Sequence, residues 1–291
     1  MDRELILGRP FLIQYVDSSL LIYDDIGDSL FLLVDLKEND RVYRFGQKGE
    51  GNNEFLQVFA FCNMKSDSIL GVYDAYKHEL REINLDKVKR GEMNFPVVFK
   101  DTLSSIKLSP TKYDAYLGLG FYESNMLSLT DNSIGSKFFF EYPYKDSREK
   151  AISNRLRGMA YQGTLCSNRS LDKFLYAVCS APIFMLFSVN KDGIEKTYEL
   201  IGGYPNYVTE ETGEYRSAPM SADNKMSFTM AYATDNYIYL LYSGKNFRDA
   251  GMDAFKANVI YQLSWNGKPI NKFETDYPLT NFCVSDNDDV L

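Results

Sequence analysis

Short apolar runs separated by polar turns recur along the chain, and they come in groups of four. In the first group the runs alternate with turns at residues 17–19, 25–28 and 37–40. Short runs rich in β-branched and aromatic residues, bounded by Gly, Asn, Asp or Ser, are typical of β-strands. Four such strands within roughly 35 residues match the size of one blade of a β-propeller.

The same plan repeats after the first group. The expected strands are 11–15, 20–23, 29–36 and 41–45; then 58–63, 68–73, 79–84 and 96–99; then 105–108, 115–121, 126–129 and 137–142; then 159–165, 173–179, 182–190 and 195–200; then 227–233, 237–243, 258–264 and 269–275. A further run at 280–284 and a turn at 285–289 begin a sixth group, which stops at Leu291. We therefore expect an all-β, six-bladed β-propeller of four-stranded antiparallel blades. It would form a single domain over residues 1–291, with its last blade truncated at the C-terminus.

Two long loops interrupt this regular pattern. Residues 146–157 have helical spacing, with Asp146 or Ser147 as the expected N-cap, and predict one short helix. A second, polar loop extends from residue 201 to residue 223. Among the tight turns, Asn266-Gly267 is the strongest hairpin signal, because Asn-Gly fits a type I′ turn.

A glycine-rich segment runs from Phe45 to Phe55 and contains Gly46, Gly49 and Gly51. Such glycines could form a phosphate-binding loop, but a dinucleotide fingerprint requires a helix after the glycines. Here an apolar, strand-like run follows instead. The segment is therefore interpreted as the passage from the outer strand of one blade to the inner strand of the next.

Four stretches resemble the TolB-like six-bladed β-propeller family, which is similar in style to NHL-repeat propellers. Residues 45–55, FGQKGEGNNEF, resemble the family junction FG-x-x-G-x-G-P-G-E-F, with Asn52 and Asn53 in place of Pro and Gly. The other three are residues 237–245 (YIYLLYSGK), 259–270 (VIYQLSWNGKPI) and 282–291 (FCVSDNDDVL). The resemblance implies an extracytoplasmic or cell-envelope location and a sixth blade closed by strands from both termini.

Charge and hydropathy argue against a nucleic-acid partner and against a transmembrane helix. A net charge of −8 and the absence of a lysine- or arginine-rich run argue against nucleic acid, because phosphate binding requires a basic face. The chain contains no apolar run of about 18 residues, so no transmembrane helix is predicted. The first ten residues lack the basic-then-apolar pattern of a signal peptide, so a native N-terminus would leave the protein in the cytoplasm.

Catalytic motifs are scarce. The single histidine, His78, lies in an expected turn, no G-x-S-x-G motif is present, and a multi-histidine zinc site is excluded. Acidic residues near strand ends are either turn caps, which we favour, or ligands of a divalent metal around the central channel; they are Asp74, Asp131, Glu141, Asp235 and Asp286. We expect no cofactor, and a divalent metal only if the protein is an enzyme.

The cysteines leave the cellular compartment open. None of Cys62, Cys166, Cys179 and Cys283 forms a C-x-x-C pair or has metal-ligand spacing. Cys166 and Cys179 flank a predicted hairpin, so a cross-strand disulfide is one alternative. Buried free thiols, which behave as small apolar side chains, are the favoured one.

Arginine and tyrosine side chains of the two long loops are the expected binding residues, because these residue types suit exposed anchoring at a channel mouth. They are Arg155, Arg157, Tyr161, Tyr207, Tyr215 and Arg216. The leading hypothesis is a non-catalytic binding or scaffolding propeller that recognises a protein or carbohydrate ligand through loops at one face of the central channel. The alternative is a metal-assisted hydrolase or lyase acting on a sugar or lactone at the channel mouth. A third hypothesis is a fragment of a larger secretion or sensor system. The ligand and the oligomeric state are left open.

Overall fold

The computed structural model describes the chain except for residues 1–6, 27, 39–40, 132–134, 213–214 and 290–291, and except for the side chains of Glu211 and Tyr215. The chain forms two compact units. Unit 1 contains residues 1–104 and 281–291, and unit 2 contains residues 105–280. The expected single domain remains a prediction.

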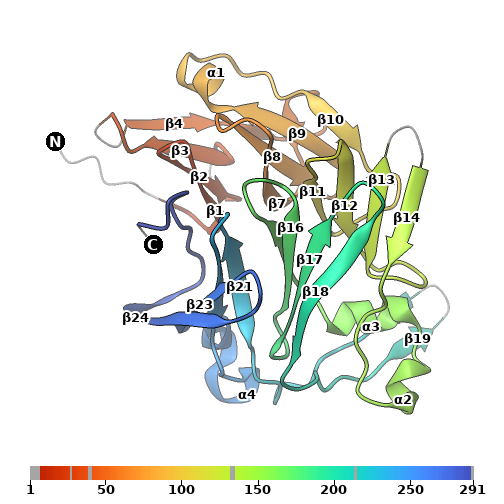
Figure 1. Cartoon of the computed structure of the whole chain (residues 1–291). Helices are drawn as coiled ribbons and strands as arrows, with labels where there is room; N and C mark the ends of the chain where they lie inside the picture. Colours follow the sequence, from red (N-terminus) through yellow and green to blue (C-terminus); the bar gives the residue numbers. More distant parts are fainter. Residues whose placement is uncertain (1–6, 27, 39–40, 132–134, 213–214, 290–291) are drawn as a thin grey trace. The chain divides into compact units, whose positions relative to one another are not determined.

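Each unit is built from four-stranded antiparallel sheets in which sequence neighbours pair with each other (Figure 1). The strands of unit 1 are β1 (Pro10–Val16), β2 (Ser19–Asp24), β3 (Phe31–Asp35) and β4 (Arg41–Phe45), then β7 (Val58–Asn63), β8 (Ile69–Asp74), β9 (Glu79–Asn84) and β10 (Val97–Lys100). The strands of unit 2 are β11 (Lys107–Pro110), β12 (Ala115–Leu119), β13 (Leu127–Asp131) and β14 (Gly135–Phe139); β15 (Gly163–Ser167), β16 (Lys173–Val178), β17 (Ile183–Val189) and β18 (Ile194–Ile201); and β21 (Phe228–Ala233), β22 (Tyr237–Tyr242), β23 (Ala257–Ser264) and β24 (Pro269–Leu279).

The described residues thus contain five four-stranded sheets, each at the place of one predicted group of four strands. The expected strand at 280–284 is wrong, because β24 continues to Leu279 and residues 281–285 have no regular structure. A turn follows at 286–287 as expected, while the last two residues lie outside the described part. A sixth blade therefore remains a prediction.

The central strands of the sheets form the core. In the second sheet of unit 2, six of the seven residues of β17 are buried, whereas the outer strand β18 is mostly exposed. A run that is buried on both faces reads as nearly continuous apolar sequence, and β17 is Ile-Phe-Met-Leu-Phe-Ser-Val. Unit 1 has a core of its own, in which Phe31 packs edge-on against Phe55 at 4.9 Å between ring centroids.

The glycine-rich segment connects the two sheets of unit 1, as predicted. Gly46 has a φ of 73°, and a Cβ there would lie 2.4 Å from the ring of Phe31, so only glycine fits this close approach. The two short strands β5 (Gln47–Lys48) and β6 (Glu54–Phe55) pair in parallel within it. Buried Arg81 donates to the carbonyl oxygen of Asn52 and holds the segment against the sheet. The segment is a structural junction.

Asn52 and Asn53, which replace Pro and Gly of the family pattern, do not adopt positive φ. Asn53 instead accepts a hydrogen bond from the backbone N–H of Phe95 at 3.2 Å and donates to the carbonyl oxygen of Met93 at 3.2 Å. The asparagine side chain therefore ties the junction to the connection before β10.

Helical turns occur at more places than the sequence predicted. The expected helix at 146–157 is two helices, α2 (Ser147–Lys150) and α3 (Asn154–Ala160). Because α3 extends to Ala160, the strand predicted from residue 159 begins only at Gly163. Additional helices are α1 (Leu85–Lys89), α4 (Phe247–Ala250) and the 3₁₀ helix η1 (Gly251–Phe255). The second long loop also contains a hairpin of β19 (Glu210–Thr212) and β20 (Tyr215–Ser217).

The turn at Asn266-Gly267 connects β23 and β24, but it is not of type I′. That type requires positive φ at both central residues, and here only Gly267 has it, at 79°. The backbone N–H of Gly267 donates to the carbonyl oxygen of Ser264, and a register shift follows in the β23–β24 pairing. The hairpin prediction is confirmed and the turn type is wrong.

Candidate functional site

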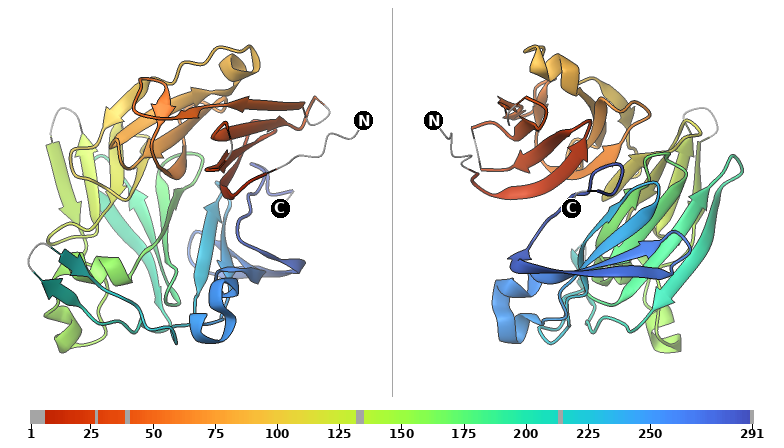
Figure 2. Two further views of the ribbon diagram at one scale, coloured as in Figure 1. Left: turned by 180° about the vertical axis from the view of Figure 1, so that it is seen from behind. Right: turned by 60° about the vertical axis from the view of Figure 1, so that its left-hand side comes forward.

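Three long connections emerge from the same end of the sheets of unit 2. They are residues 140–162 between β14 and β15, residues 202–227 between β18 and β21, and residues 243–256 between β22 and β23. In an antiparallel sheet, alternate connections lie at the same end, so these three share one end. Figures 1 and 2 show α2, α3, β19 and α4 together at the lower end of the unit. We call these three segments the insertion layer.

The first connection is shaped by its helix caps. Asp146 is the N-cap of α2, and its Oδ1 accepts hydrogen bonds from the backbone N–H groups of Arg148 and Glu149, both at 2.9 Å. The N–H of Glu149, followed by that of Arg148, lowers the pKa of the Asp146 carboxyl group. Ser153 caps α3 in the same way, through a bond from the N–H of Leu156. The sequence prediction of Asp146 as an N-cap is confirmed.

Glu149 forms the centre of the first connection. It is the third residue of α2 and is 4% exposed, and its Oε2 accepts a hydrogen bond from the backbone N–H of Lys145 at 2.6 Å. As in a capping box, the glutamate reaches back past the start of its helix, and here it pairs the N–H of the residue before the N-cap. Its Oε1 accepts the hydroxyl proton of Tyr161 at 2.8 Å. The carboxylate thus links α2 to the end of α3.

Tyr207 brings the second connection to the same carboxylate. Its ring packs edge-on against that of Tyr161 at 6.3 Å between centroids. Its hydroxyl group is buried and forms no hydrogen bond of normal geometry with the described residues. Burial raises the pKa of both tyrosines, and the Glu149 carboxylate raises each of them further. A shallow cavity of about 210 Å³ lies here, lined by residues that include Arg148, Glu149 and Tyr207.

Arg157 is a buried cross-link rather than an exposed anchor. It is 2% exposed, and its guanidinium donates to the Glu141 carboxylate at 2.9 Å and to the carbonyl oxygen of Tyr142 at 3.1 Å. Its guanidinium carbon also lies 5.2 Å from the ring centre of Tyr144. Arg155 is the second residue of α3. It is partly exposed and forms an ion pair with Glu123 at 3.6 Å. The two arginines therefore have different structural roles.

The second and third connections are bonded to each other. The Arg248 guanidinium pairs with the Asp223 carboxylate, and the Arg248 N–H donates to the carbonyl oxygen of Ala222 at 2.9 Å. The backbone N–H of Met226 donates to the carbonyl oxygen of Lys245 at 2.7 Å. Together with the Tyr161–Tyr207 contact, these bonds join all three connections into one continuous layer.

Large apolar side chains are exposed on every part of this layer. The most exposed of them are Val208, at 64%, and Met252, at 70%. The others are Tyr144 in the first connection, Tyr204 and Met220 in the second, and Phe247 and Phe255 in the third. Clusters of exposed apolar side chains beside polar ones are typical of interaction surfaces.

Basic side chains accompany the exposed apolar ones. Lys145 and Arg148 are exposed, and neither side chain forms an ion pair with a residue that the structure describes. Lys150 lies over the ring of Tyr144, with its Nζ 5.2 Å from the ring centre. This part of the first connection is therefore locally basic on a chain whose net charge is −8.

The six predicted binding residues all lie in the insertion layer. Arg157 and Tyr161 are buried, Tyr207 and Arg155 are partly exposed, and Arg216 is exposed on β20. Tyr215 is also on β20, but its side chain lies outside the described part of the structure. The structure brings Tyr161 and Tyr207 to Glu149, and Arg157 lies near enough to Tyr207 to interact with it electrostatically. Ligand binding by the six residues remains a prediction.

Glu149 and most of the exposed apolar residues were not predicted from the sequence. The pattern Asp146-Ser-Arg-Glu149 is an N-cap followed three residues later by glutamate, which is the signature of a capping box. Val208, Met220, Phe247 and Met252 are isolated apolar residues within polar stretches. An apolar residue without strand or helix periodicity has no obvious place in a core, and this signal could have identified them.

The acidic residues considered as metal ligands are positioned as caps and partners. Asp74 accepts backbone hydrogen bonds, Asp235 accepts from Ser170, and Glu141 pairs with Arg157. In the described part of the chain, no three His, Cys, Asp or Glu residues are grouped so that they could hold a metal ion. His78 lies in the β8–β9 turn with a φ of 54°. The metal-assisted alternative remains a prediction.

The cysteines are free thiols. Cys166 lies opposite Leu175 in the β15–β16 pair, while the N–H of Cys179 bonds to the carbonyl oxygen of Gln162. The two cysteines are therefore at different register positions, and a cross-strand disulfide between them is excluded in this fold. Burial raises the pKa of each thiol to about 12.

Four-stranded antiparallel sheets joined in sequence, with long connections at one end, define a β-propeller protein. The family model for TolB-like 6-blade propeller-like proteins matches residues 2–287, and the chain belongs to that family. The resemblance inferred from the four sequence stretches is thus confirmed. A comparison with curated protein sequences gives no match. Among described residues, no helix is long and apolar enough to cross a membrane.

Several solved structures share the fold. A putative exported protein from Bacteroides fragilis is 11% identical with a TM-score of 0.54, and the alignment covers 96% of this chain and 73% of that one. A member of the DUF4221 family from Bacteroides vulgatus is 12% identical with a TM-score of 0.51, covering 94% and 83%. Hydrazine synthase from Kuenenia stuttgartiensis is 11% identical with a TM-score of 0.50, covering 99% and 93%. At these identities the similarity shows the fold alone.

Proposed function

We propose that this protein is a non-catalytic binding or scaffolding β-propeller that captures a protein ligand through the insertion layer of unit 2. The observation that carries the proposal is the layer itself. Three connections from one end of the sheets are bonded into one surface, and each exposes large apolar side chains. A surface that is already ordered loses little conformational entropy when a ligand binds.

The chemistry of the layer favours a partner segment that is both apolar and acidic. Val208, Met252 and Tyr144 offer apolar contact area, and apolar and aromatic anchors supply most of the affinity in protein interfaces. Lys145 and Arg148 offer positive charge at the rim, and Lys150 adds a third positive charge to this stretch, which the nearby Asp146 carboxylate offsets only in part. Complementary charge at the rim speeds association and selects the partner. A carbohydrate ligand, the other class that the sequence left open, is an outcome of the tests below.

Peptides selected from a random phage-displayed library on the native protein are expected to combine apolar residues with Asp or Glu. The double substitution Arg148→Glu/Lys150→Glu should weaken their binding by about tenfold or more, because it turns attraction at the rim into repulsion. Val208→Ser should also weaken it by removing apolar contact area. Fluorescence anisotropy with labelled peptides measures both effects.

The matched control is Tyr277→Ser, which removes another exposed apolar side chain, 79% exposed, from strand β24 of the same unit. It should leave peptide affinity unchanged, and all variants should retain the native melting temperature. Peptides that bind the doubly substituted protein as tightly as the native protein would contradict the proposal. A neutral oligosaccharide that binds the native protein but not a Tyr144→Ser/Tyr204→Ser variant would instead make the ligand a carbohydrate.

We also propose an extracytoplasmic or cell-envelope location. The family resemblance motivates it, and a structure of the same fold carries the description of a putative exported protein. Fractionation of the source cells, followed by detection with an antibody, should place the protein with envelope or secreted markers. Recovery together with a cytoplasmic marker enzyme would overturn this part of the proposal.

A further inference from the structure

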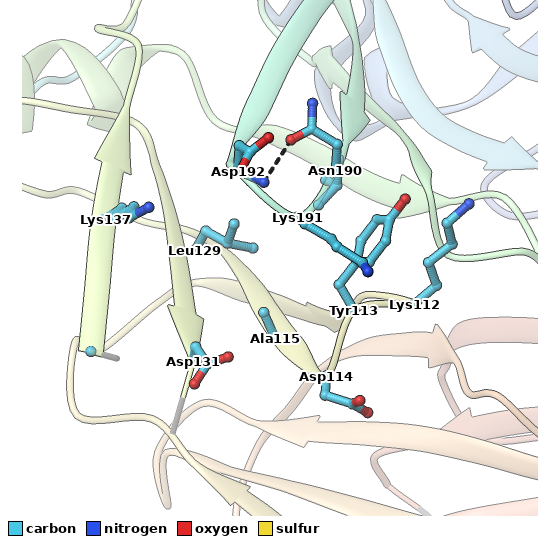
Figure 3. Close-up of a pocket in the computed structure, with 12 residues that line it drawn as sticks. Lys112, Tyr113, Asp114, Ala115, Leu129, Asp131, Lys137, Asn190, Lys191 and Asp192 are labelled. Carbon is cyan, nitrogen blue, oxygen red and sulfur yellow. Dashed lines mark hydrogen bonds between the residues drawn. The ribbon is translucent and has the colours of Figure 1, made fainter. Parts of the chain in front are cut away.

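A second cavity of unit 2 lies at the opposite end of the sheets from the insertion layer. It has a volume of about 420 Å³ and opens between the sheet β11–β14 and the sheet β15–β18 (Figure 3). Its walls include the β11–β12 turn and the β17–β18 turn. Cavities that bind small molecules in proteins have volumes of roughly 300–1,000 Å³. This cavity is therefore large enough for a small organic ligand.

The inner wall of the cavity is apolar. Val189 and Ala115 are buried, while Leu129 and Tyr113 are partly exposed toward it. Figure 3 shows Leu129 and Ala115 between the two sides of the cavity. Burying the apolar body of a ligand here would favour binding by roughly 25 cal/mol for each Å² of apolar surface that is removed from water. The wall therefore suits an aromatic or branched aliphatic group.

Lysine side chains surround this apolar wall, and they differ in whether they form an ion pair with a carboxylate. The Lys112 ammonium group is paired with the Asp172 carboxylate at 2.6 Å. Lys137 on β14 and Lys191 on the β17–β18 turn are exposed, and neither side chain pairs with a carboxylate in the part of the chain that is described. Figure 3 shows these two lysines on opposite sides of the cavity, with Leu129 between them. Lys137 and Lys191 thus bring two positive charges to a cavity whose lining also includes aspartates.

Carboxylates are also present at the rim. Asp114 and Asp131 each have a further interaction of their own, so neither is free. Asp192 is exposed on the β17–β18 turn, where its backbone N–H donates to the side chain of Asn190 at 2.8 Å. The Asp192 carboxylate is a hydrogen-bond acceptor at the rim, next to Lys191 in the sequence. It suits a ligand with an N–H or O–H group next to its anionic group.

We propose that this cavity binds a small organic carboxylate with an aromatic or branched aliphatic body. The carboxylate lies at the ammonium group of Lys137 or of Lys191, and the body lies against Leu129, Val189 and Tyr113. A charge-assisted hydrogen bond from one of these lysines orients the ligand, because such bonds are stronger than neutral ones. This site is independent of the proposed protein-binding surface. Its ligand could be a free acid or the carboxyl-terminal residue of a peptide, which share this chemistry.

The test compares three probes of equal shape by NMR titration of the full-length protein: 3-phenylpropionate, 3-phenylpropanol and 3-phenylpropylamine. The acid is expected to bind with a Kd in the millimolar range or below, about tenfold more tightly than the alcohol, and the amine should bind weakest. The peptide Gly-Gly-Gly-Phe, with a free or an amidated C-terminus, then shows which source of carboxylate the cavity prefers.

The double substitution Lys137→Met/Lys191→Met should reduce affinity for the acid to that for the alcohol, while affinity for the alcohol stays the same. Lys268→Met is the matched control, because Lys268 is an exposed lysine on the β23–β24 turn that forms no ion pair with a residue the structure describes. It should leave binding of the acid unchanged. Equal affinities of the native protein for acid and alcohol, or full retention of acid binding in the double variant, would overturn the proposal.

Discussion

Replacing Asp74 with alanine is expected to lower the free energy of unfolding by at least about 3 kcal/mol. Asp74 ends β8 and is fully buried. Its carboxylate accepts hydrogen bonds from the backbone N–H groups of Leu56 at 2.6 Å, Gln57 at 3.2 Å, Tyr76 at 3.1 Å and Lys77 at 3.1 Å. Alanine leaves these donors without an acceptor, and an unpaired buried polar group costs about 1–3 kcal/mol. Urea denaturation followed by circular dichroism measures the loss.

The Asp74→Ala experiment has two useful comparisons. Asp74→Asn keeps one acceptor oxygen and should have an intermediate effect. Glu50→Ala removes an exposed carboxylate from the glycine-rich segment of the same unit and should change stability by less than about 0.5 kcal/mol. If Asp74→Ala were no more destabilising than Glu50→Ala, the hydrogen bonds of Asp74 would not have the structural role assigned to them.

Glu149→Ala is expected to have the second-largest effect. It should lower the free energy of unfolding by about 2–3 kcal/mol, and it should also weaken ligand binding at the insertion layer. The substitution removes the acceptor for the Tyr161 hydroxyl and for the Lys145 N–H, both of which are held by a nearly buried carboxylate. Without it, α2 loses its hydrogen bond to Tyr161 at the end of α3. Thermal denaturation measures the stability, and hydrogen exchange over residues 140–162 should show faster exchange than in the native protein.

Two variants separate local from general effects of Glu149. Glu149→Gln keeps an oxygen that can accept from Tyr161, so it should be milder than Glu149→Ala. Glu123→Ala removes a carboxylate that is 74% exposed and lies 3.6 Å from Arg155, and exposed pairs of this kind contribute little. Unchanged hydrogen exchange in Glu149→Ala would show that this carboxylate does not order the layer.

The sheets were the most predictable part of the molecule. Alternating short apolar runs and polar turns mark strands directly, and all five sheets formed where a group of four runs was expected. The junction from Phe45 to Phe55 was also interpreted correctly, because an apolar strand follows its glycines. The prediction of a strand at 280–284 was wrong because a short apolar run indicates that residues are buried, not that they pair with a neighbouring strand. Phe282 and Val284 are indeed buried, but without a strand.

The short helices could not be predicted from periodicity. Helices α1 and α4 have five and four residues, too few to show an apolar stripe. Only their caps leave a local signal. Asn84 accepts from the N–H of Lys87, and Asn246 accepts from that of Asp249. An asparagine also occurs in many turns, so such a cap does not distinguish a helix from a turn.

The candidate site was predicted in location but not in detail. Arginine and tyrosine side chains serve in cores as well as at interfaces, because each has an apolar body and a polar end. The sequence therefore could not show that Arg157 and Tyr161 are buried while Arg216 is exposed. That distinction depends on the fold of the connections, including the Glu149 contacts that join residues about 60 positions apart in the sequence.

The placement of the three long connections at one end of the sheets has a consequence for how such a protein can diversify. Each sheet of unit 2 is held in register by bonds between neighbouring strands, and the turns that the structure describes at the other end are short. A connection of different length or sequence can therefore be grafted at the long-loop end without shifting a strand. Sequence differences between relatives of this fold would then be concentrated in the connections at this end. A loop transplanted into another protein of this fold would carry its binding specificity with it.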